Sequence, residues 1–252
     1  MKYREFGADQ QQTIVLLHGG GLSWWNYREA AKMLRKDYHV VLPILDGHAG
    51  SDRPFTSIED NAAEILSFLD KHYAGSVLLI GGLSLGGQIL LEMLSQRKDI
   101  CSFALVESAM VIPSKLTNAM IGPAFSGSYN LIKNRSFSEL QFRSLHMKPE
   151  LFEDYYRDTC LITRQDLIAF MKANTSYELK DTFSRTSAEV HVFAGAKENR
   201  GIRRSAELIA GSLPSCEPQY LPGCYHGEFS INHPDQYAAA VRQICSRKTE
   251  SV

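Results

Sequence analysis

A serine set between two glycines is the residue of this chain whose surroundings best suit catalysis. Gly82, Ser84 and Gly86 occupy the fixed positions of the pattern G-x-S-x-G. The apolar run 77–80 before it predicts a strand buried on both faces, and the run 85–94 after it predicts a helix. A serine on so sharp a strand-to-helix turn has a strained backbone and an outward-pointing hydroxyl, which is the placement of a nucleophile.

A serine hydroxyl becomes a good nucleophile only when a base accepts its proton and a third group orients that base. His226 and Glu198 suit these two roles, because each lies in a loop just after a predicted strand, as Ser84 does. Such loops meet at the carboxyl edge of a parallel sheet. The sequence therefore predicts a catalytic set in the chain order Ser84, Glu198, His226.

The sequence offers one alternative to Glu198 as the acid and one to His226 as the base. Glu107 ends the strand that follows the serine motif and is the alternative acid, although the loop context favours Glu198. His233 is the alternative base, but it directly precedes Pro234 at a predicted helix start, which favours a capping or surface role.

Other polar residues near the predicted strand ends are interpreted as structural. We expect His18 to bond to neighbouring backbone, and His48 and Asp46 to brace a polar loop. The remaining histidines have no motif context: His39, His72, His146 and His191.

The strands and helices expected around these residues predict an α/β fold with a mostly parallel, doubly wound sheet. Strands are expected at 3–6, 13–17, 40–45, 77–80, 103–107, 190–194 and 217–221. Helices are expected at 22–36, 57–69, 85–94 and 202–213, and from Pro234 onward. Strand-helix alternation on both sides of an insert is the basis of this prediction.

The stretch 110–187 has a different character from the rest of the chain. It lacks clear strand-helix alternation, is rich in aromatic residues, and predicts short helices such as 149–161 and 165–174. An insert of this kind between core strands is typical of a cap that gates an active site. We therefore expect a core formed by 1–109 and 188–252 and a helical cap formed by 110–187. A helical subdomain that only packs on the core is the alternative.

Composition indicates a globular protein of enzyme size. Of the 252 residues, 44% are hydrophobic, and the net charge of −1 gives no sign of nucleic-acid binding. The charged N-terminal stretch and the absence of an apolar run of about 18 residues predict neither a signal peptide nor a membrane helix. Five scattered cysteines suggest neither a disulfide framework nor zinc. We expect a cytoplasmic protein that acts on a small molecule, with no metal, cofactor, nucleic-acid or membrane partner; the sequence leaves the oligomeric state open.

Together these motifs resemble the α/β-hydrolase family, in its branch with a helical cap. The resemblance covers nearly the whole chain, and it rests on His18-Gly19, the loop 46–54, the turn 82–87, Gly195-x-x-Glu198 and Gly223-x-x-His226. The family usually has aspartate at the position of Glu198. The resemblance implies that Ser84 is the nucleophile, that His226 is the base and then the acid, and that Glu198 holds the imidazole.

The resemblance also implies an oxyanion hole and a class of substrates. The backbone N–H groups of Leu85 and Gly20, with Gly21 as the alternative to Gly20, would bind the oxyanion. A serine nucleophile disfavours the epoxide hydrolase and haloalkane dehalogenase branches, which use a carboxylate. We expect an apolar pocket, and with it a carboxylesterase, from Gly21, Trp24, Trp25, Met110 and Phe125.

Two other functions remain open at this point. A carbon–carbon bond hydrolase, or a related lyase of the same fold, would need polar or cationic cap groups, for which the candidates are Arg135, Arg143, Lys148, Arg157 and Arg164. A ligand-sensing protein could instead keep the hydrolase fold without efficient turnover.

Overall fold

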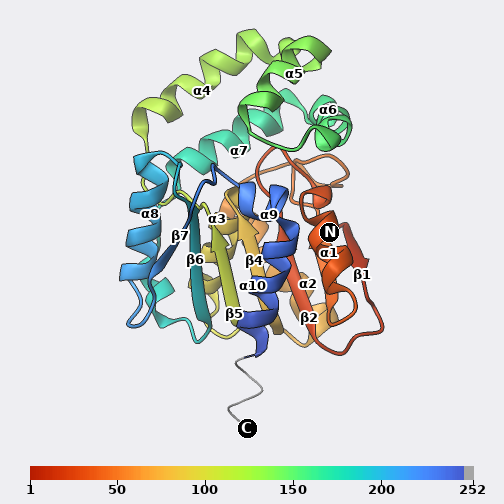
Figure 1. The fold of residues 1–252 in the computed structure, drawn as a ribbon. Helices are drawn as coiled ribbons and strands as arrows, with labels where there is room; N and C mark the ends of the chain where they lie inside the picture. The colour runs from red at the N-terminus through yellow and green to blue at the C-terminus, as the bar shows by residue number, and fades with distance from the viewer. Residues whose placement is uncertain (247–252) are drawn as a thin grey trace.

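A seven-stranded sheet forms the centre of the structure, a computed structural model that describes residues 1–246 (Figure 1). The strands are β1 Tyr3–Phe6, β2 Thr13–Leu17, β3 His39–Pro43, β4 Val77–Leu83, β5 Cys101–Glu107, β6 Glu189–Gly195 and β7 Pro218–Leu221. They lie in the order β1-β3-β2-β4-β5-β6-β7. β1 is antiparallel to β3, and the other pairings are parallel. The predicted mostly parallel, doubly wound α/β fold is confirmed.

Helices cover both faces of the sheet (Figure 1). α1 (Arg28–Leu34) and α10 (Pro234–Ser246) pack on one face, and α2 (Ile58–Tyr73), α3 (Leu85–Gln96) and α8 (Arg200–Gly211) pack on the other. β4 is buried over its whole length, as expected for a central strand with helices on both sides. The loops that follow the parallel strands therefore gather at one edge of the sheet.

The segment between β5 and β6 forms helices beyond that carboxyl edge (Figure 1). They are α4 Lys115–Ser128, η2 Tyr129–Lys133, α5 Arg135–Ser144, η3 Pro149–Leu151, α6 Phe152–Leu161 and α7 Arg164–Ser176. The chain then returns along α3, through η4 (Asp181–Arg185), to β6. None of the helices within residues 1–246 is long and apolar enough to cross a membrane.

Two buried contacts attach these helices to the core. The indole N–H of Trp25 donates to Asp158 of α6 at 2.8 Å. Phe170 of α7, only 1% exposed, stacks on His48 with ring centroids 4.6 Å apart. Because both partners of each contact are buried, the helical segment has a defined position over the sheet edge.

The helix predicted at 22–36 begins later in the structure, so the predicted start is wrong. Residues Trp24–Tyr27 form a 3-10 turn, η1, and the α-helix begins only at Arg28. The reason is long-range: Trp25 turns toward Asp158, while the Asn26 side chain accepts from the Gly19 amide at 3.3 Å. η1 thus holds the loop after β2 in place, and a regular helix there would lose these contacts.

Candidate active site

Ser84 lies at the junction of β4 and α3 with φ 52° and ψ −111°, a conformation that non-glycine residues rarely adopt. The Ser84 amide donates to the Glu107 carbonyl oxygen at 2.8 Å, which anchors the turn to β5. A Cβ added to Gly82 would collide with the Gly86 carbonyl, and one added to Gly86 would collide with the Leu17 carbonyl. The two glycines therefore allow strand, helix and neighbouring strand to approach closely around the serine.

Glu198 and His226, from the loops after β6 and β7, are joined directly. The Nδ1 atom of His226 lies 2.7 Å from Oε2 of Glu198. The other carboxylate oxygen, Oε1, accepts from the Ser108 hydroxyl at 2.5 Å and from the Gly195 amide at 2.8 Å. Burial opposes ionisation of Glu198, but its bonds to His226, Ser108 and Gly195 outweigh burial and hold its pKa below the ordinary value. Glu198 is thus an anion at neutral pH with both oxygens bonded.

Ser84, Glu198 and His226 all line one cavity of about 290 Å³. Their loops are packed together, because a Cβ added to Gly227 would lie 3.2 Å from the Leu83 side chain. These two residues are the direct neighbours of His226 and Ser84. The structure therefore brings the predicted nucleophile, acid and base to one place, although they are far apart in sequence.

The two residues predicted to bind the oxyanion are also neighbours. A Cβ added to Gly20 would lie 3.5 Å from a methyl group of Leu85, and Gly20 lines the cavity. The amide of Gly21, the alternative donor, instead donates to Nε2 of His48 at 3.0 Å. Because that N–H already has a partner, Gly20 is the better candidate of the two.

Two buried histidines hold the glycine loop. Nε2 of His18 accepts from the Leu45 amide at 3.1 Å, and Nε2 of His48 accepts from the Gly21 amide. Each Nδ1 atom bonds to a backbone carbonyl, that of Asp46 in the case of His48. Both rings are therefore neutral, with the proton on Nδ1. Burial lowers the pKa of His18 to about 3 and that of His48 to about 4.

Residues 14–240 match the model of the alpha/beta hydrolase family. The chain belongs to this family. The predicted resemblance is confirmed over most of the sequence.

The three proteins compared next are distant from this α/β hydrolase in sequence. One is "Uncharacterized hydrolase YugF" of Bacillus subtilis (strain 168), 26% identical over 102 residues, which are 40% of this chain and only 37% of the relative. An esterase from Exiguobacterium antarcticum superimposes with a TM-score of 0.81 at 16% identity, covering 97% of this chain and 94% of the esterase. A meta-cleavage product hydrolase from Pseudomonas fluorescens IP01 superimposes with a TM-score of 0.74 at 18% identity, covering 98% and 94%. At these identities the two structures share the fold.

The predicted pocket residues do not line the cavity of this α/β hydrolase. The described residues that do so are Gly19, Gly20, Leu22, Leu83, Ser84, Ser144, Leu145, His146, Met147, Lys197, Glu198, Asn199, Tyr225, His226, Gly227 and Ile231. The set therefore omits the predicted Gly21, Trp24, Trp25, Met110 and Phe125.

Three of these predicted residues have other partners. Trp25 is 1% exposed and bonded to Asp158. Trp24 lies beneath the guanidinium of Arg28, and the Met110 sulfur accepts from the Ser205 hydroxyl at 3.5 Å. These contacts direct the two indoles and the thioether into packing against the core and α8.

Sequence reasoning missed the residues that replace them. The turn after α5 contributes Leu145, His146 and Met147, and it carries no motif. Ser108, which bonds to the catalytic-acid candidate Glu198, was also missed. The sequence signal that could have identified Ser108 is its position directly after Glu107, at the end of β5. Among residues 1–246, no group of three or more histidine, cysteine, aspartate or glutamate side chains could hold a metal ion.

Glu107, the alternative acid, is buried in the core beside the site. It is 1% exposed; Oε1 accepts from the Ser230 amide at 3.3 Å, and Oε2 has no partner among the described residues. Burial raises the pKa of its carboxyl to about 7. The imidazole of His226 bonds to Glu198 and not to Glu107, so the geometry favours Glu198 as the acid.

Replacing Glu107 with glutamine is expected to stabilise the protein at alkaline pH. The carboxyl pKa is 4.5 ordinarily and about 7 in the folded chain. As pH rises through this window the unfolded chain loses its proton first, so the wild type loses stability that the variant keeps. We expect a gain of on the order of 2–3 kcal/mol at pH 8 and none at pH 4. Urea unfolding of both proteins at the two pH values measures this, and a pH-independent difference would contradict it.

Proposed function

We propose that this α/β hydrolase cleaves small to medium-sized carboxylic esters through an acyl-enzyme on Ser84. The observation that carries the proposal is the Glu198–His226 pair set beside the strained serine in one cavity. His226 accepts the serine proton as the hydroxyl attacks the ester carbonyl, and Glu198 stabilises the imidazolium. The amides of Gly20 and Leu85 bind the oxyanion.

The second half of the reaction uses the same groups. His226 gives its proton to the leaving alcohol, and the acyl group remains on Ser84. A water molecule then loses a proton to His226 as it attacks the acyl carbonyl. His226 returns that proton to the Ser84 oxygen as the carboxylic acid leaves, which restores both residues. No group beyond this set and water is required for the balance of atoms and protons.

The cavity supports an acyl group of modest size. Its volume of about 290 Å³ is small, and its apolar lining comes from Leu22, Leu83, Leu145, Met147 and Ile231. Apolar walls with a few placed polar groups favour a short hydrocarbon stretch beside the reacting carbonyl. This lining is the basis for preferring an aliphatic ester.

The basic residues that a carbon–carbon bond hydrolase would need do not line the cavity in this structure. Arg135 pairs with Glu153, and Arg157 pairs with Asp154 and Asp158. None of the five basic cap residues named above is among the described residues that line the cavity. These five residues therefore do not supply the positive charge that would hold a dicarboxylate in that reaction.

Covalent labelling with a fluorophosphonate, together with a p-nitrophenyl ester series from acetate to decanoate, tests the proposal. We expect phosphonylation of Ser84 alone in the peptide masses, and an optimum at short to intermediate acyl length. Heat-denatured protein is the control and should not be labelled. Labelling without turnover of any ester would favour carbon–carbon bond hydrolysis, and no labelling would favour a ligand-sensing protein.

A further inference from the structure

We propose that the ester cleaved at Ser84 carries a carboxylate, which Lys197 binds at the mouth of the catalytic cavity. The inference rests on the proposed esterase function and adds the charge of its substrate. It follows from where Lys197 is held, from the charges around it, and from a second basic hollow beside it.

Lys197 has a defined place at the cavity. It directly precedes Glu198, lines the cavity, and holds its ammonium 5.0 Å from the centroid of the Tyr225 ring. The ring of His146 stacks on the same tyrosine, with centroids 4.0 Å apart and planes at 8°. An aromatic face attracts a cation but carries no net charge. The ring therefore positions the ammonium without neutralising it.

Carboxylates of the protein do not neutralise this lysine either. The ion pairs found among residues 1–246 do not include Lys197. Glu198, the one acid among the described lining residues, has both oxygens bonded and a side chain that is only 1% exposed. Nearby Glu228 bonds to the Tyr225 amide and to Asn232.

The reaction itself makes no use of the lysine. When His226 takes the serine proton, Glu198 balances the imidazolium that forms, and the amides of Gly20 and Leu85 bind the oxyanion that forms with it. The ammonium of Lys197, exposed to solvent at the cavity, takes part in neither contact and can bind another anion. An anionic group on the substrate supplies the missing partner, and the charge-assisted bond fixes the end of the substrate away from the reacting carbonyl.

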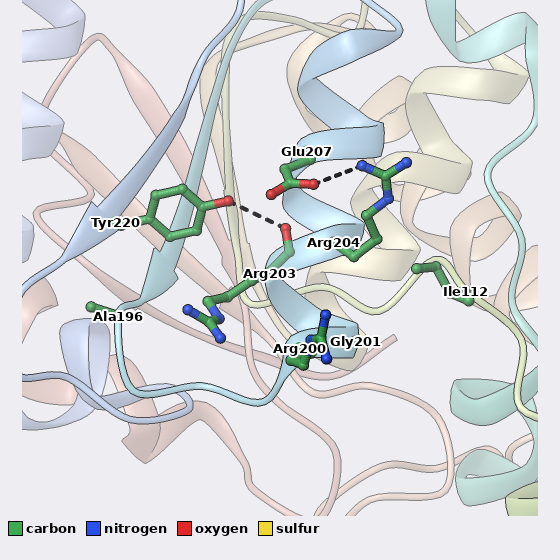
Figure 2. Close-up of a pocket in the computed structure, with 8 residues that line it drawn as sticks. All are labelled: Ile112, Ala196, Arg200, Gly201, Arg203, Arg204, Glu207 and Tyr220. Atoms are coloured by element: carbon green, nitrogen blue, oxygen red, sulfur yellow. Dashed lines mark hydrogen bonds and ion pairs between the residues drawn. The ribbon is translucent and has the colours of Figure 1, made fainter.

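A second basic hollow adjoins the same loop (Figure 2). It has a volume of about 830 Å³, and Ala196, Arg200 and Arg203 are among its lining residues. Arg204 pairs with Glu207 at 2.8 Å, whereas the guanidinium groups of Arg200 and Arg203 have no ion-pair partner in the described part of the chain. Ala196 and Arg200 directly flank Lys197, Glu198 and Asn199, which line the catalytic cavity. We expect the two arginines to raise the positive potential on this side of the loop and to attract anions toward it.

Two esters of equal acyl length test the inference: p-nitrophenyl hexanoate and the mono-p-nitrophenyl ester of adipic acid, which ends in a carboxylate. At pH 7.5 and low salt we expect wild-type kcat/KM to be higher for the adipate by about 10-fold, and to approach the hexanoate value as salt is added. Lys197→Met should lower the adipate-to-hexanoate ratio of kcat/KM by about 10-fold, mainly through KM for the adipate.

Two further variants complete the test. Arg200→Gln combined with Arg203→Gln should lower adipate kcat/KM by about two- to threefold at low salt, as expected for steering without contact. Lys36→Met, an exposed cation between α1 and β3, is the matched control and should change neither ester. An unchanged adipate-to-hexanoate ratio in Lys197→Met would overturn the inference while leaving the esterase proposal intact. Failure of the wild type to hydrolyse either ester would overturn the esterase proposal itself.

Discussion

Ester hydrolysis is expected to fall by on the order of 10⁵- to 10⁶-fold in kcat when Ser84 is replaced by alanine. The acyl-enzyme cannot form without the hydroxyl, and the residual rate comes from the oxyanion amides and substrate binding alone. Initial rates with the best p-nitrophenyl ester, corrected for spontaneous hydrolysis, measure the loss. Fluorophosphonate labelling should disappear in the same variant.

The fold of this variant should be preserved. The strained turn at residue 84 is held by backbone bonds, from the Ser84 amide to the Glu107 carbonyl and from the Gln88 amide to the Ser84 carbonyl. Alanine keeps both bonds, so the melting temperature should stay within a few degrees of the wild-type value. The matched control is Ser144→Ala, since Ser144 lines the same cavity but donates its hydroxyl to the Gln141 carbonyl. Loss of activity in the control, or retention of it in Ser84→Ala, would contradict the assignment.

The sheet and the serine turn could be predicted because their causes are local. Four buried apolar residues at 77–80 suit a central strand, and the glycines beside Ser84 suit a crowded turn. The convergence of Glu198 and His226 followed from one general property, that parallel strands end at the same edge of a sheet. Residues far apart in sequence could therefore be placed together without knowledge of side-chain packing.

The walls of the cavity could not be predicted because their causes are not local. The partner of Trp25 is Asp158, 133 residues away. A tryptophan near a glycine loop is compatible with a pocket or with the core, and only the position of α6 decides between them. The turn after α5 reaches the cavity through Asn232, which accepts from the Lys148 amide and donates to the His146 carbonyl. No sequence pattern marks such a contact.

Replacing Glu198 with glutamine is expected to lower kcat by on the order of 10⁴-fold with little change in KM. The glutamine amide has no charge to stabilise the imidazolium of His226, and its NH₂ group can present a donor where Nδ1 needs an acceptor. The ring would then take the wrong tautomer. Glu107→Gln should stay within a few-fold of wild type, because Glu107 makes no bond to the imidazole.

Ser108→Ala is expected to lower kcat by an amount between the effects of Glu107→Gln and Glu198→Gln. It removes the hydroxyl that donates to Oε1 of Glu198 at 2.5 Å but leaves the carboxylate and its bond to His226. Loss of one bond to a charged group corresponds to a decrease in kcat of about 10-fold or somewhat more. The pKa of Glu198 should also rise, because the hydroxyl that stabilises its charged form is gone.

The ranking of the three variants distinguishes a catalytic acid from a structural one. If Glu198 orients the base, kcat falls in the order Glu107→Gln, Ser108→Ala, Glu198→Gln. If Glu107 were the acid, Glu107→Gln would be the most damaging variant and Ser108→Ala would leave kcat nearly unchanged. A purely structural role for Glu198 would lower the melting temperature and the active fraction but leave kcat per active site near the wild-type value. Steady-state kinetics, with the active fraction from fluorophosphonate labelling and melting temperatures for each variant, separate these cases because each changes a different quantity.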